Sequence, residues 1–155
     1  MSTLTPAALA LLLAAAVLPA RADDHRRRSV APPALVAQEC GSCHVVYPPA
    51  LLPAASWQAL MGGLVRHFGS DASLDERSTR EIGAWLQANA GTGRRASEPP
   101  PENRITRSAW FGREHREIGS AVWARPAVRT PANCGACHTG AAQGDFDEHA
   151  VHIPR

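Results

Sequence analysis

The chain has 155 residues, and its 16 basic side chains, all of them Arg, nearly balance 14 Asp and Glu, which gives a net charge of +2. This balance provides no argument for binding nucleic acid or an anionic membrane surface. No apolar stretch after residue 22 is long enough to span a bilayer, so we expect a soluble mature protein without stable membrane insertion.

The first predicted element is an export signal peptide in residues 1–22. Its apolar run is too short for a membrane span and is followed by Ala20-Arg21-Ala22, an A-x-A cleavage pattern that would leave Asp23 first in the mature chain. No Lys or Arg precedes the run, which departs from the usual signal pattern, and an uncleaved anchor is the alternative. From the cleavage pattern we expect export, with the mature chain in the periplasm.

Two C-x-x-C-H motifs use every cysteine of the chain. They are Cys40-Gly41-Ser42-Cys43-His44 and Cys134-Gly135-Ala136-Cys137-His138. This spacing attaches c-type haem, because each thiol can add to one vinyl group of the porphyrin while the following His is held under the iron. A zinc site would use the C-x-x-C pairs but leaves both His unexplained, and a redox C-x-x-C is the other alternative.

The motifs therefore predict two covalently attached haem c groups. The cysteines that would bind them are Cys40, Cys43, Cys134 and Cys137, and His44 and His138 would be iron ligands. Haem attachment at this motif takes place on the exported side of bacterial membranes, so the signal peptide and the motifs support each other.

A helix is predicted from Ser56 to Phe68, with Ser56 as its N-cap. Its apolar stripe, spaced i, i+3, i+4, i+7 and i+11, consists of Trp57, Leu60, Met61, Leu64 and Phe68. His67 lies at the edge of this stripe. Met61 is the only Met left once the signal peptide is removed, and a core position inside the stripe suits it. His67 is therefore the candidate second ligand of the first haem.

A second helix is predicted from Leu74 to Ala90, with a capping box at Ser73 and Glu76 and with Gly91 as its end. Its apolar face consists of Ile82, Trp85 and Leu86. The order of haem motif, middle helix and closing helix is similar to that of a class I cytochrome c, in which Met would be the second ligand.

The Pro- and Gly-rich segment 93–103 is predicted to be a linker. It separates an N-terminal c-type haem domain, residues 23–92, from a C-terminal one, residues 104–155. Units this small bury little surface of their own, so each fold is expected to depend on its haem.

A short helix is predicted over residues 107–118, where Phe111, His115 and Ile118 share one face. His115 is the candidate second ligand of the second haem, although its charged neighbours would also suit a surface histidine. His149 and His152 near the C-terminus are alternatives, and His25 in the polar start of the mature chain is expected to be a spectator.

The chain resembles the small bacterial dihaem cytochromes c, two-domain periplasmic proteins found with a high-spin c-type cytochrome and a membrane b-type cytochrome. The matching stretches are Glu39 to His44, Tyr47 to Pro53, His67 to Gly69, Asp71 to Leu74, Arg104 to Thr106, Trp110 and Phe111, Arg113 to His115, Asn133 to His138, and Gly144 to Pro154.

The resemblance implies a mainly α fold, with a class I cytochrome c-like N-terminal haem domain and a small irregular helical C-terminal haem domain. It also implies bis-histidine coordination, with His44 paired to His67 and His138 paired to His115. The implied partners are the membrane b-type cytochrome as electron donor and the high-spin c-type cytochrome as acceptor.

Two irons that are closed on both faces have no position for a substrate, so we expect a low-potential electron carrier, acting as a monomer, and not an enzyme. The alternative is a dihaem peroxidase or small-ligand reductase with one open iron, which would need acid–base groups beside it. A ligand sensor or haem store is a third class. A high-spin component in the ferric spectrum would favour the enzyme or the sensor over the electron carrier.

Overall fold

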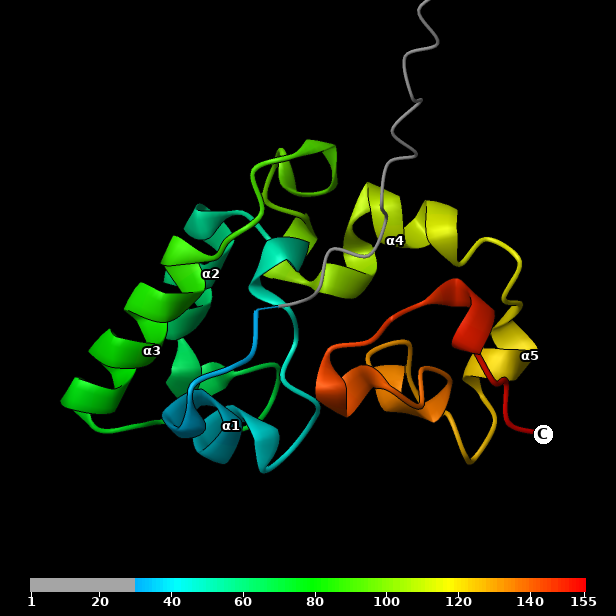
Figure 1. Ribbon diagram of the computed structural model, residues 1–155, viewed down its shortest axis with the longest axis horizontal. Coiled ribbons are helices and arrows are strands. Elements are labelled where there is room, and N and C mark those ends of the chain that lie inside the picture. Colours follow the sequence, from blue (N-terminus) through cyan, green and yellow to red (C-terminus); the bar gives the residue numbers. More distant parts are fainter. Residues whose placement is uncertain (1–29) are drawn as a thin grey trace, which may run out of the picture.

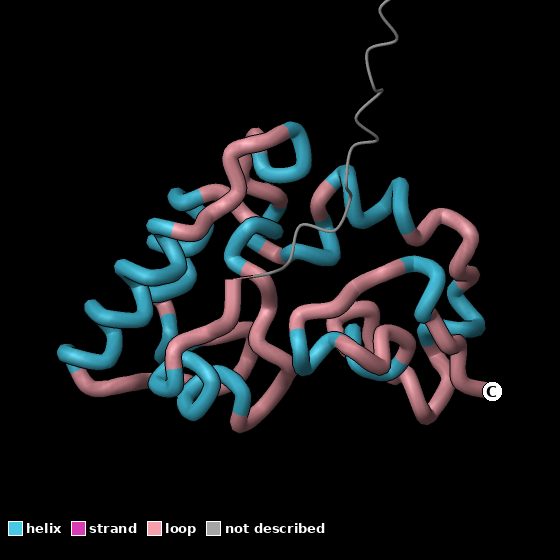
Figure 2. The backbone as a smooth tube through the Cα atoms, viewed as in Figure 1, coloured by secondary structure: helices cyan, strands magenta, loops and turns pink. Residues whose placement is uncertain are grey.

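In the computed structural model the chain is described from residue 30 to residue 155, and this part is built of short helices and loops without a named strand (Figures 1 and 2). The predicted signal peptide, its cleavage site and His25 lie outside the described residues. The expected mainly α fold is confirmed. None of the helices between residues 30 and 155 is long and apolar enough to cross a membrane.

The N-terminal half contains three helices, α1 (Ala34–Gly41), α2 (Ala54–Met61) and α3 (Glu76–Ala88). Helices α2 and α3 lie side by side, and α1 is in contact with α3 (Figure 1). Their shared core consists of Val36, Leu52, Trp57, Ile82 and Leu86. The indole N–H of Trp57 donates to the Pro49 carbonyl over 2.7 Å, which ties the core to the turn before α2.

The prediction of one helix from Ser56 to Phe68 is wrong at both ends. Helix α2 begins after Pro53, so Ser56 lies buried inside its first turns and is not the N-cap. Gly62 and Gly63 follow its last residue, and because glycine loses the most backbone entropy in a helix, the α-helix stops there. A 3₁₀ turn at Leu64–Arg66 continues the chain, and His67 follows it.

Helix α3 is shorter than the predicted range of residues 74–90, and its cap differs. The Asp75 carboxylate accepts the Ser78 backbone N–H over 3.0 Å, whereas Ser73 is bonded to Asp71 outside the helix. Beyond the helix, Gly91 donates its N–H to the Leu52 carbonyl over 2.9 Å. A Cβ at this position would collide with the Ala50 carbonyl oxygen, so only glycine permits the approach.

The C-terminal half has two helices, α4 (Ala109–Glu114) and α5 (Ser120–Trp123), followed by 3₁₀ turns and loops (Figure 2). Helix α4 is shorter than the predicted range of residues 107–118. The Ser108 hydroxyl caps its start by accepting the Phe111 N–H, and His115 is its C-cap. The buried apolar residues of this half are Phe111, Val128 and Ala141.

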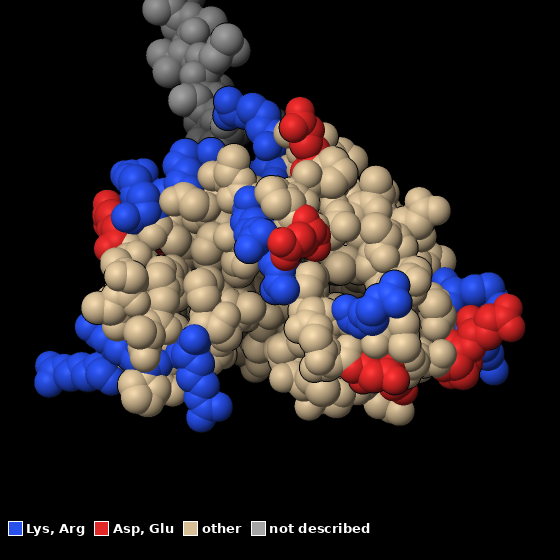
Figure 3. Space-filling view, turned by 180° about the vertical axis from the view of Figure 1, so that it is seen from behind, with Lys and Arg blue, Asp and Glu red and all other residues tan. Residues whose placement is uncertain are grey.

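The predicted linker at residues 93–103 contains two 3₁₀ turns, Arg94–Ala96 and Pro101–Asn103. Ala96 and Pro100 are buried, so this segment packs against the rest of the chain. The division into two domains at this segment stays a prediction. Positive and negative side chains stand next to each other at several places on the face shown in Figure 3, as the near-balance of charge suggests.

Candidate haem sites

The first C-x-x-C-H motif lies at the end of α1. Cys40 is in the last turn of this helix, and burial raises the pKa of its thiol, while Cys43 is exposed in the turn that follows. The Ser42 hydroxyl donates to the Glu39 carbonyl over 3.0 Å and holds this turn. None of the four cysteines is in a disulfide, so all four thiols are free for attachment.

His44 and His67 face each other across the first site. Their ring centroids are 6.3 Å apart and their planes differ by 23°. The Nδ1 of His44 lies 2.7 Å from the Val45 carbonyl oxygen, and a neutral ring that donates from Nδ1 keeps its lone pair on Nε2. Two imidazole nitrogens on opposite sides of one metal are about 4 Å apart, with the ring centres somewhat farther, so this spacing suits one metal atom.

The surroundings of His67 favour the neutral form of its ring. Its pKa is lowered first by burial and then by electrostatic interactions with His44 and Arg104. Its Nδ1 is buried and has no partner among the described residues. A neutral imidazole is the form that binds metals, so these surroundings fit the role that the sequence predicts.

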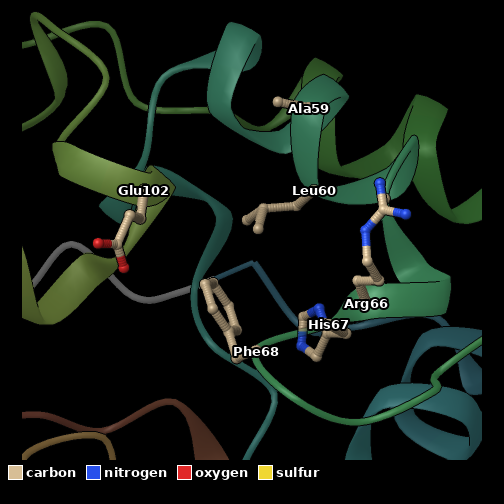
Figure 4. A pocket seen from close by; sticks show the side chains of 7 residues that line it. Ala59, Leu60, Arg66, His67, Phe68 and Glu102 are labelled. Carbon is tan, nitrogen blue, oxygen red and sulfur yellow. The ribbon is translucent and has the colours of Figure 1, made fainter.

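A cavity of about 220 Å³ lies beside His67 (Figure 4). In this view Leu60 lies on one side of the cavity and Phe68 and His67 on the other, with Arg66 and Glu102 at its rim. The wall of Leu60 and Phe68 suits one apolar face of a porphyrin and the Arg66 guanidinium suits a propionate, while the motif residues Cys40, Cys43 and His44 do not line this cavity. The residues at the first site therefore fit a haem.

The second site pairs His138 with His115 at a ring-centroid distance of 6.2 Å and an interplanar angle of 72°. His115 ends α4, its Nδ1 lies 3.0 Å from the Phe111 carbonyl oxygen, and its ring stacks on Phe111 at 4.0 Å. Burial and the charge of His115 lower the pKa of His138, against a smaller opposing effect of Asp145. The His138 Nδ1, like that of His67, is buried without a partner among the described residues.

The alternative ligands are placed differently. The side chain of His149 is 87% exposed beside Glu148, and His152 is exposed as well. The C-terminal segment contacts the second motif through its backbone, since the His152 N–H donates to the Cys137 carbonyl over 2.9 Å. Met61 packs against Gly83 of α3 and the core, which is the position expected for it.

The two sites meet at Tyr47, the only tyrosine of the chain. Its ring stacks on His44 at 4.7 Å, and its hydroxyl donates over 2.7 Å to the carbonyl of Ala132, which precedes Cys134 by two residues. Burial, with a smaller effect of Cys134, raises the pKa of Tyr47 to about 12, so the phenol keeps its proton at neutral pH. Sequence reasoning assigned no role to this residue, because the contact is between segments far apart in the chain.

Comparison with known families decides what these paired sites hold. The family model described as dihaem cytochrome c matches residues 36–146. The chain belongs to the dihaem cytochrome c family. Its two C-x-x-C-H motifs are accordingly sites of covalent c-type haem, and the protein is a haem-based electron carrier. The predicted resemblance is confirmed, and the zinc and redox interpretations of the motifs are excluded.

Solved dihaem cytochromes c resemble the chain along nearly their whole length. One structure of DHC from Rhodobacter sphaeroides is 45% identical, with a TM-score of 0.66, covering 76% of this chain and 99% of that one. The dihaem cytochrome from Shewanella baltica is 39% identical, with a TM-score of 0.69, covering 78% of this chain and 92% of its own. No protein among the curated ones matches. The partners implied by the resemblance stay predictions.

Proposed function

We propose that this dihaem cytochrome c is a periplasmic, low-potential electron carrier in which both irons are bound by two histidines. His44 and His67 would bind the first iron, and His138 and His115 the second. The observation that carries the proposal is the facing of two imidazoles at each site, at ring-centroid distances of 6.3 Å and 6.2 Å.

The bound haems supply one-electron chemistry. The chain would close both faces of each iron with imidazole, which leaves no position for substrate. The carbonyls of Val45 and Phe111 accept hydrogen bonds from His44 and His115, which fixes the tautomer and makes each ring a stronger donor. Because imidazole donates to ferric iron better than a thioether does, both potentials should lie below that of a Met/His cytochrome.

The contact between the two motif loops supports electron passage from one site to the other. Tyr47 joins the ring of His44 to the backbone that leads into Cys134. The Val45 side chain reaches Gly135, where a Cβ would lie 3.5 Å from it. These contacts place the two motif loops against each other.

The proposed donor is a membrane b-type cytochrome and the proposed acceptor a high-spin c-type cytochrome, both supported by the resemblance alone. Export rests on the signal peptide predicted in residues 1–22, with cleavage after Ala22. Mass spectrometry of the protein from a periplasmic extract should give a chain that begins at Asp23 and carries two haems. A chain retaining residues 1–22 would contradict export by cleavage.

A spectroelectrochemical titration tests the proposal. Both haems of the holoprotein should be reduced at potentials below that of a Met/His cytochrome c in the same cell, and carbon monoxide should bind the ferrous protein only weakly, because it must displace a histidine. His67→Ala and His115→Ala should each open one iron to carbon monoxide, while the matched control Met61→Leu should not. Carbon monoxide binding by the unaltered protein as tight as that of either Ala variant would instead favour the peroxidase or small-ligand reductase.

A further inference from the structure

The turn that carries His67 has a strained backbone. Residues 67–70 form a tight turn in which the Ser70 N–H donates to the His67 carbonyl over 3.1 Å. Phe68 has a φ of 50° and Gly69 a φ of 100°. Glycine tolerates this left-handed region, but a phenylalanine in it is disfavoured by its Cβ. Such a conformation persists only where surrounding contacts hold it.

Arg104 supplies such a contact from a distant part of the sequence. Its guanidinium lies 4.2 Å from the centroid of the Phe68 ring, which is the distance of a cation–π stack. Phe68 is otherwise only partly covered: 43% of the residue is exposed, and its ring lies 4.9 Å from the ring of His67. The stack therefore adds a contact from outside the strained turn.

The Arg104 guanidinium is itself held by an ion pair. The Arg104 Nε donates to Glu102 over 2.9 Å, and the other oxygen of this carboxylate accepts from Arg107 over 2.6 Å. Glu102 and Asn103 are also left-handed, with φ of 56° and 55°. The strained turn at His67 thus faces a second strained turn, and Arg104 joins the two.

We propose that Arg104 is a positioning residue for the first haem, whose guanidinium stacks on Phe68 and holds the strained turn so that His67 faces His44. The inference rests on the proposed function, because it takes His67 as an iron ligand. It makes coordination at the first haem depend on the segment 102–107, which leads into the C-terminal half.

Carbon monoxide binding by the ferrous holoprotein tests this role, because carbon monoxide competes with His67 for the iron. A cation–π stack at a partly exposed site corresponds to roughly a fivefold change in an equilibrium constant. Arg104→Ala should therefore raise the apparent carbon monoxide affinity about fivefold relative to the unaltered protein, at no more than one site per chain. Arg107→Ala is the matched control, because it removes a charge from the same Glu102 without removing the stack, and its affinity should stay unchanged.

Two further variants separate the effect of the stack from that of the Arg104 charge. Phe68→Leu removes the ring and leaves the Arg104–Glu102 pair, and it should raise the affinity as much as Arg104→Ala does, with no further rise in the double variant. Arg104→Lys keeps the charge but loses the plane, so it should also loosen His67. The inference would be overturned if Arg104→Ala had the same carbon monoxide affinity as Arg107→Ala. It would also be overturned if Arg104→Lys had the affinity of the unaltered protein.

The variant His67→Ala distinguishes the failure of this inference from the failure of the proposed function. If His67→Ala opens the first iron and Arg104→Ala does not, His67 is the ligand and Arg104 does not position it. If His67→Ala leaves the iron closed, the ligand assignment is wrong and the positioning role fails with it.

Discussion

The two halves of the molecule bind the same group but differ in the length of their helices and in the size of their buried core. In the N-terminal half, three helices share a core of five buried residues, and α3 alone has 13 residues. In the C-terminal half, the longer helix, α4, has 6 residues, and Phe111, Val128 and Ala141 are buried without forming one such cluster. The same C-x-x-C-H motif therefore lies in two very different structural settings.

The difference teaches how each half depends on its haem. The N-terminal half has apolar contacts between its own helices, which do not need the cofactor as a partner. The C-terminal half gathers its aromatic rings around the histidine pair, with Phe111 and Trp123 against His115 and Phe146 against His138. A unit with so little core of its own needs the flat apolar haem and the iron link to complete its fold.

The largest expected effect comes from breaking the iron link of the C-terminal half. His115→Ala should convert the second haem to high spin and make residues 104–155 sensitive to limited proteolysis, because the loop from residue 115 to residue 138 is no longer closed through the iron. The N-terminal half should resist cleavage.

The matched control is His67→Ala, which should open the first iron but leave residues 30–90 protease-resistant, since their core remains. Equal proteolytic sensitivity of the two halves in the two variants would remove the contrast. A fully low-spin His115→Ala protein would point to His149 or His152 as the ligand.

A smaller effect is expected from truncating one core residue in each half. Ile82 and Val128 are both fully buried. Ile82→Ala should lower the free energy of unfolding by about 2–5 kcal/mol, as truncations in a packed core do. Val128→Ala should cost roughly 1.6 kcal/mol, from about 0.8 for each carbon removed.

Denaturant unfolding of the two holoproteins, followed by circular dichroism, measures the difference. An equal or greater cost for Val128→Ala would mean that the C-terminal half has a packed core after all, and the comparison between the halves would fail.

The smallest effect concerns the contact that joins the halves. Tyr47→Phe keeps the stack on His44 but removes the hydrogen bond to the Ala132 carbonyl. The loss should be about 1 kcal/mol, the usual net value of one hydrogen bond. It should appear as an earlier unfolding of the C-terminal half, with the N-terminal transition unchanged. Coincident transitions at the original midpoint would show that the bond does not couple the halves.

The sequence was most informative where the chemistry is local. The C-x-x-C-H spacing identified the attachment sites, and the i, i+4 spacing of Phe111 and His115 matches the observed stack of the two rings. His67 also faces His44, and its role as an iron ligand stays a prediction. The motif and the stack depend on residues within one or two helical turns of each other.

What the sequence did not predict depends on contacts between distant segments or on competing local preferences. The double glycine after Met61 ends α2 although the apolar stripe continues. Asp75 caps α3 because Ser73 is already bonded to Asp71. Helix α1 was missed, since it lacks a pronounced apolar stripe. The contacts of Tyr47 with Ala132 and of Arg104 with Phe68 have no signature in either segment alone.

The most direct test of the central claim is a low-temperature electron paramagnetic resonance spectrum of the oxidised holoprotein, because it reports the spin state and axial ligands of both irons together. Facing histidines at both sites predict low-spin ferric signals that account for two haems per chain, with one of them converted to high spin in His67→Ala and the other in His115→Ala. A high-spin signal of one haem in the unaltered protein would contradict bis-histidine coordination and the electron-carrier account built on it.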